Sequence, residues 1–218
     1  MFRQILYTQW KWSRLVVLLL TLVGFAIPVL SVRPAADYTL EHWEARALLN
    51  SIESWGVLYP LLAAAAAVIM AMATWGPDHH GHHVYALSLP LPRWHYALLR
   101  FGAGAILLAA PVVAVWLGAL VGTASAVIPP GLHAYPQALA LRFGLALLLA
   151  YSVFFAISAG TVRTAGYVLG LLAALVVIQV MASVANVHIN VLEWILNQVY
   201  IWPGPLEIFT GRWMLIDV

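Results

Sequence analysis

The stretch that decides the fold is YALLRFGAGAILLAAPVVAVWLGALV, residues 96–121. It contains one arginine near its start and no other charged side chain. A helix rises about 1.5 Å per residue, so a run of this length is long enough to cross a hydrocarbon core of about 30 Å. Its apolar residues are continuous rather than alternating with a period of two, which favours a helix over a barrel strand. We therefore expect a transmembrane helix here.

Four further runs of the same kind predict additional spans at residues 15–32, 55–75, 138–158 and 164–183. The whole chain has 218 residues, of which 64% are hydrophobic and only 8% are charged. A soluble domain has about 25% charged residues, so the solvent for most of this chain is lipid. The predicted fold class is all-α: a polytopic membrane helix bundle with five spans, forming a single transmembrane domain over residues 1–218.

The segments outside these runs predict two surface elements. Residues 1–14 mix aromatic and basic side chains, which is typical of an interfacial elbow helix lying on the membrane; the alternative is a flank that anchors the first span. Residues 185–216 alternate apolar and polar positions around Pro203-Gly204-Pro205, which predicts a broken amphipathic segment on the outer side. A sixth span over residues 187–202 is the alternative reading of that segment. Lysine and arginine are distributed so as to favour a cytoplasmic N-terminus.

Small residues in the spans indicate where helices pack closely. Gly118 and Gly122 form one G-x-x-x-G pattern, and Gly166 and Gly170 form another. Such patterns let helices approach closely in lipid, either within one chain or between two copies. None of the five runs has an aspartate, glutamate or lysine in its interior. Because ion-coupled transporters usually need such a group, this pattern argues against secondary transport.

Histidines are concentrated in the connection between the second and third runs, at His79, His80, His82 and His83. Imidazole is a good ligand for zinc, copper, nickel and iron, so a metal site is one hypothesis. Pro77 and Gly81 argue against a helix here, and adjacent histidines point in different directions in regular structure. The competing reading is a polar loop in which histidine is a near-neutral interfacial residue.

The rest of that connection resembles the permease subunits of ABC transporters of the type-2 exporter class. In these, an acid, a glycine and a leucine-rich stretch ending in Leu-Pro-x-x-Arg precede the third span. In this chain the pattern is matched by Asp78, Gly81, Leu87, Leu89, Pro90 and Arg93. Leu91 and Pro92 lie between the last two of these and are counted with them as candidate docking residues. The resemblance extends to the elbow-like N-terminus, the spacing of the spans and the broken segment after the fifth run. It departs from the family at the histidines and at a sixth span, which we expect to be absent or to follow Val218.

The resemblance implies that residues 76–95 dock separate ABC ATPase subunits. It also implies a second permease subunit, identical or related, and a bacterial cytoplasmic (inner) membrane location. This chain has no G-x-x-x-x-G-K-[ST] loop, and Lys11 is its only lysine. We therefore expect no enzymatic activity and no cofactor in this chain, with ATP and magnesium bound by the partner. Membrane lipid is an expected partner, and the formal charge of +2 gives no indication of nucleic acid. Two alternatives are open: a histidine-dependent metal- or haem-handling membrane protein, and a non-transporting membrane assembly subunit.

Overall fold

A computed structural model describes residues 2–32, 41–80, 92–125, 132–159, 167, 170, 174, 177, 181, 209 and 213–216. These residues are almost entirely helical. The elements are α1 (Phe2–Val32), α2 (Glu41–Gly56), α3 (Leu58–His80), α5 (Arg93–Ser125), β1 (Leu132–Ala134), α6 (Pro136–Ala159) and β2 (Met214–Ile216). Within them, four helical stretches are long and apolar enough to cross a membrane: Phe2–Val32, Leu48–Gly76, Trp94–Ser125 and Pro136–Ala159. Such a set of helices is that of an integral membrane protein.

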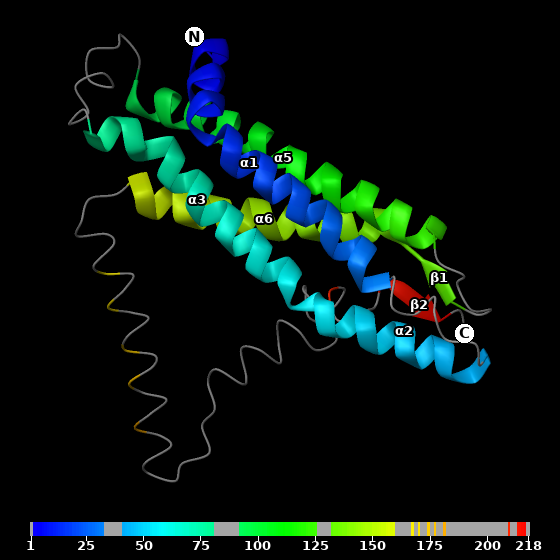
Figure 1. Ribbon diagram of the computed structural model, residues 1–218. Coiled ribbons are helices and arrows are strands. Elements are labelled where there is room, and N and C mark those ends of the chain that lie inside the picture. Colours follow the sequence, from blue (N-terminus) through cyan, green and yellow to red (C-terminus); the bar gives the residue numbers. More distant parts are fainter. Residues whose placement is uncertain are drawn as a thin grey trace.

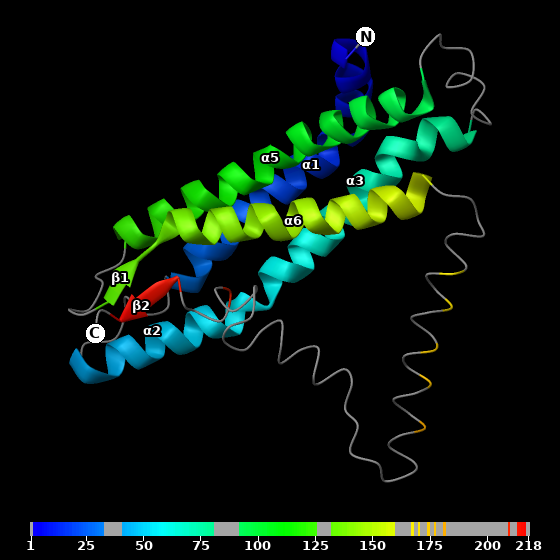
Figure 2. The same cartoon turned by 180° about the vertical axis from the view of Figure 1, so that it is seen from behind.

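The four long helices form a bundle in which α1 and α5 run in one direction and α3 and α6 in the other (Figures 1 and 2). The most extensive packing joins α1 to α5, and the next most extensive joins α3 to α6. At one end of the bundle α1 and α5 begin while α3 and α6 end. We call this the arginine end, because Arg100 is buried there, and we call the opposite end the strand end.

Close approach of α1 and α5 depends on glycines. A Cβ atom built at Gly118 would overlap the carbonyl oxygen of Phe25 and lie 3.1 Å from the carbonyl carbon of that residue. One at Gly122 would lie 3.1 Å from the carbonyl oxygen of Pro28. The first G-x-x-x-G pattern therefore lies against the backbone of α1 within this chain. In lipid, such backbone contact is a main source of helix association, because apolar side chains gain little by leaving a lipid solvent.

The strand end is closed by segments distant in sequence. Strands β1 and β2 pair antiparallel, with Leu132 opposite Ile216, and the amide of Tyr135 donates a 2.7 Å hydrogen bond to the Trp213 carbonyl. Trp213 is fully buried, and the buried Phe209 ring stacks on Tyr59 of α3 at 5.5 Å between centroids. The strand pairing satisfies backbone groups that would otherwise be costly at the membrane boundary.

Helix α2 also lies at the strand end, on the end of α1. Ile52 is fully buried, and the Ser51 hydroxyl donates a 2.8 Å hydrogen bond to the carbonyl of Ser31 in α1. The last residues of α2 continue into the second span, which covers Leu48–Gly76 with a turn at Val57. The predicted run 55–75 lies within this span, and α2 before it was not predicted.

Three other sequence predictions are changed or left open. Two short strands are present, so the described part of the chain is not purely helical. Helix α1 continues without interruption from Phe2 to Val32, with its first turns at an angle to the rest (Figure 1), so residues 1–14 form no separate helix. Of the predicted fifth run, only five residues are described, all helical and exposed: Tyr167, Gly170, Ala174, Val177 and Met181. Most of residues 164–208, Gly166 included, lies outside the described residues. The predictions of a fifth span and of a sixth span therefore stay predictions.

Candidate functional site at the ends of α3 and α5

The connection predicted to dock a partner joins the end of α3 to the start of α5. The helices extend further into it than the sequence indicated. Asp78, His79 and His80 belong to the last turn of α3 rather than to a loop. Pro77 costs that turn one backbone hydrogen bond, and the helix nevertheless continues past it.

The remaining predicted docking residues are split between the start of α5 and a part of the chain that the structure does not describe. Pro92 is exposed, and its carbonyl accepts a 3.2 Å hydrogen bond from the amide of Tyr96. This bond closes the first turn of α5, which begins at Arg93. The others lie outside the described residues: Gly81, Leu87, Leu89, Pro90 and Leu91, with His82 and His83 among them.

Arg100 joins the two helices that carry this connection. Its side chain is 8% exposed, and its guanidinium donates a hydrogen bond to the carbonyl of Thr74 near the end of α3. The guanidinium carbon lies 4.9 Å from the ring centroid of Tyr96 and 5.7 Å from that of Trp75. A cation is favoured both beside aromatic faces and near the C-terminal carbonyls of a helix. Arg100 therefore ties α5 to the last turns of α3.

Helix α1 meets the same point. The buried Gln9 amide donates a 3.2 Å hydrogen bond to the Arg100 carbonyl, and the buried Ser13 hydroxyl donates one of 2.7 Å to the carbonyl of Gln9. Polar side chains that bond across helices are worth about 0.6 to 2 kcal/mol each in a membrane. The first turns of α1 are therefore held to α5 by a specific polar contact as well as by packing.

Aromatic rings extend the junction to α6. Phe101 stacks on Tyr151 at 5.1 Å and meets Phe155 edge-on at 5.3 Å, while Trp75 lies 5.2 Å from Phe155. The hydroxyls of Tyr151 and Thr74 lie 3.5 Å apart. Such ring pairs contribute about 0.5–1.5 kcal/mol each beyond their buried area. All four long helices therefore meet at this junction.

The histidines form no metal site that the described residues reveal. Among those residues, no three histidine, aspartate or glutamate side chains come together as candidate ligands. His79 and His80 are placed by their backbone only, and His95 is exposed and stacks on Trp94 at 3.8 Å between centroids. The metal hypothesis therefore gains no support from the part of the chain that is described.

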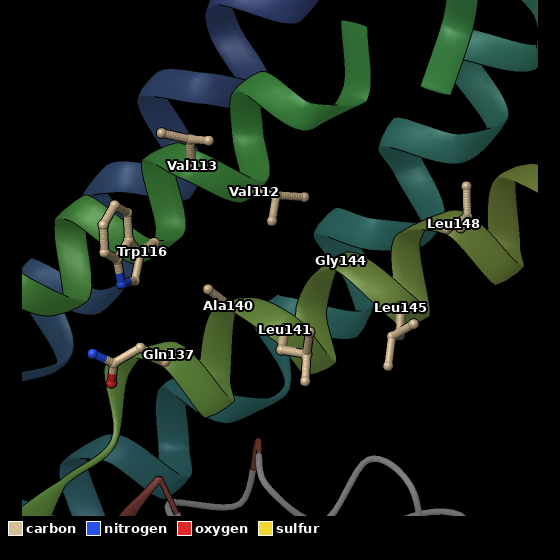
Figure 3. Close-up of a pocket in the computed structure, with 9 residues that line it drawn as sticks. All are labelled: Val112, Val113, Trp116, Gln137, Ala140, Leu141, Gly144, Leu145 and Leu148. Carbon is tan, nitrogen blue, oxygen red and sulfur yellow. The ribbon is translucent and has the colours of Figure 1, made fainter. Parts of the chain in front are cut away.

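An apolar groove of about 460 Å³ lies between α5 and α6 (Figure 3). Gly144 forms part of it, and a Cβ atom there would lie 3.2 Å from Val112 of α5. Gln137 is its single polar lining residue and sits near Trp116 at the strand end of the groove. The full lining is Val112, Val113, Trp116, Gln137, Ala140, Leu141, Gly144, Leu145 and Leu148. Chemically, such a groove suits an apolar chain rather than an ion.

The sequence pattern missed the central part of this junction. An arginine at the start of an apolar run usually reaches the headgroups and marks the membrane boundary, so the position of Arg100 in the sequence gives no indication of a buried contact. The structure instead buries it against α3. Gln9 gave a usable signal, since it is an amide within an otherwise aromatic and basic segment, but its partner lies 91 residues away in sequence.

No known protein family, curated protein or solved structure matches this chain.

Proposed function

We propose that this chain is the membrane-spanning permease subunit of an ATP-driven ABC exporter of the type-2 class. It would form the translocation path with a second permease subunit, identical or related. ATP would be bound and hydrolysed by separate ATPase subunits. The chain would reside in a bacterial cytoplasmic membrane with its N-terminus on the cytoplasmic side, where the 76–95 segment would meet the ATPase.

The observation that carries this proposal is the order of residues from Asp78 to Arg93, which follows the pattern of the ATPase-docking connection. The arrangement of the flanking helices supports it. Thr74 and Arg100 link α3 to α5 within two turns of the connection, and Gln9 adds α1. A partner that pushed on the connection would therefore move three helices together, as coupling between distant sites requires rigid elements.

The described spans fit transport driven from another subunit. No aspartate, glutamate or lysine lies inside the four apolar runs between residues 15 and 158. Such a group would be expected if a proton or cation supplied the driving force. The polar groups that face inward are hydroxyls, Gln9 and Arg100. This composition favours an amphipathic cargo over a bare ion.

Purification of the full chain from native membranes in mild detergent tests the proposal. We expect an ATPase subunit to co-purify, and its retention to fall at least tenfold in a Leu89→Ala/Pro90→Ala/Arg93→Ala variant. A matched control is Glu53→Ala/Ser54→Ala, two exposed positions at the strand end, which should retain the partner fully.

Two results would contradict the proposal. Retention of the ATPase at control levels by the triple variant would remove the docking assignment. Purification without any ATPase, together with stoichiometric metal or a Soret band, would instead favour the metal- or haem-handling alternative.

A further inference from the structure

Arg100 and Arg142 lie within two of the described spans, and they differ in their partners. Arg100 is buried and donates to a protein carbonyl. Arg142 of α6 is exposed, and no acidic side chain among the described residues pairs with it. Charged groups within spans almost always face the bundle interior or pair with another group, because an isolated charge in hydrocarbon is costly. An anion from outside the described bundle would offset the charge of Arg142.

Arg142 lies at one end of a second groove, between α3 and α6, with a volume of about 510 Å³. Every other lining residue is apolar, and small side chains such as Ala64 and Ala150 leave the space open. The groove follows α6 from Arg142 toward the arginine end as far as Phe154. Twelve residues of helix span about 18 Å, close to the roughly 15 Å depth of one leaflet of hydrocarbon.

The position of the charge matches the position of a lipid headgroup. Arg142 is six residues beyond Pro136, where α6 begins, so it lies about 9 Å from the strand end of the helix. A guanidinium at that depth can reach toward the headgroup layer and bind a phosphate bidentately. The groove would then receive an acyl chain of the same molecule, since its other lining residues are apolar.

We propose that the α3–α6 groove binds one phospholipid with an anionic headgroup, held at its phosphate by Arg142 and along its acyl chain by α3 and α6. The headgroup belongs to the leaflet at the strand end. This inference rests on the groove and on Arg142, and it stands whether or not the chain is an exporter subunit.

Native mass spectrometry of the full, delipidated chain in detergent tests this, with equimolar phosphatidylglycerol and phosphatidylcholine as probes. We expect the chain to bind phosphatidylglycerol in preference to phosphatidylcholine. The Arg142→Gln variant should reduce this preference about fivefold, which is the effect expected for the loss of one arginine contact with an anionic lipid. Arg142→Lys should keep most of it. Arg14→Gln removes the same charge from an exposed site on α1 and should leave the preference unchanged.

A second variant tests the groove independently of charge. Ala64→Phe fills the space between α3 and α6 and should lower the occupancy of both lipids, with an unchanged helical circular dichroism spectrum.

Three outcomes would overturn the proposal. One is a phosphatidylglycerol preference in Arg142→Gln equal to that of the unmodified chain. Another is full competition by inorganic phosphate at millimolar concentration, which would indicate a free-anion site. The third is loss of a chain dimer rather than of lipid in Arg142→Gln, which would assign Arg142 to a contact between copies.

Discussion

Replacement of Gly118 by alanine should separate α1 from α5. The added Cβ would overlap the Phe25 carbonyl oxygen and lie 3.1 Å from two backbone carbons of that residue. Backbone cannot rotate away as a side chain can, so the two helices must move apart. Overpacking of this kind costs about 1–3 kcal/mol, and alanine returns up to about 1 kcal/mol through helix propensity. The expected net loss in the free energy of unfolding is about 1–2 kcal/mol.

The same substitution elsewhere supplies the controls. A Cβ at Gly76 in α3 would meet nothing within 4 Å, so Gly76→Ala should be neutral or stabilising by up to about 1 kcal/mol. Gly122→Ala should be intermediate, because its nearest contact would be 3.1 Å from the Pro28 carbonyl oxygen. Helix propensity is common to all three variants, so their order reports the helix contact alone.

Unfolding by SDS in mixed micelles, followed by tryptophan fluorescence, measures these differences directly. We expect Gly118→Ala to be the most destabilising, Gly122→Ala to be intermediate, and Gly76→Ala to be the least destabilising. Equal stability of Gly118→Ala and Gly76→Ala would refute the reasoning, because it would mean that α1 and α5 do not meet at this glycine.

The same unfolding assay tests the contacts made by Arg100, Gly104 and Trp213. Arg100→Ala should cost about 2–4 kcal/mol, since it removes the hydrogen bond to α3 and two cation–π contacts; a loss below about 0.5 kcal/mol would contradict this. Gly104→Ala should cost about 1–3 kcal/mol, because the new Cβ would lie 2.7 Å from Cζ of Tyr151 and overlap its hydroxyl. Adding Tyr151→Phe should recover about 1 kcal/mol of that loss, and purely additive effects would exclude the contact. Trp213→Ala should cost about 3–5 kcal/mol and speed amide exchange in β1, whereas Trp12→Ala, at a side chain 70% exposed, should do neither.

The sequence predicted the four long helical stretches, because hydrophobic length is a direct consequence of the lipid solvent. The runs 15–32, 55–75, 96–121 and 138–158 fall within the four stretches that are long and apolar enough to cross a membrane. Each helix is longer than its apolar run, since a helix continues into the headgroup layer, where polar side chains such as Arg93 are tolerated. Helix α2 was missed because its acidic first turns hide the spacing of Leu48 and Ile52, which are both buried.

The parts that could not be predicted depend on contacts between distant residues. Periodicity shows that a residue lies on a helix, but not which neighbour it faces. Arg100 and Thr74 both lie near helix ends, and only the packing of α3 on α5 makes them partners. The pairing of β1 with β2 joins two segments of three residues separated by the whole of α6 and more. Segments this short have no detectable strand pattern, so their pairing could not be read from either one.

The closure of the strand end by Phe209 and Trp213 places two described parts of the chain at opposite ends of the bundle. Helix α6 leaves the bundle at the arginine end, where Phe155 packs on Trp75, and the chain is back at the strand end when Phe209 stacks on Tyr59. If the four long helices cross the bilayer, Phe155 and Phe209 therefore lie on opposite sides of it. Since the chain has no cysteine, single cysteines at the exposed positions Ala159 and His133, one at each end of α6, would be reached by an impermeant label from opposite sides of the membrane.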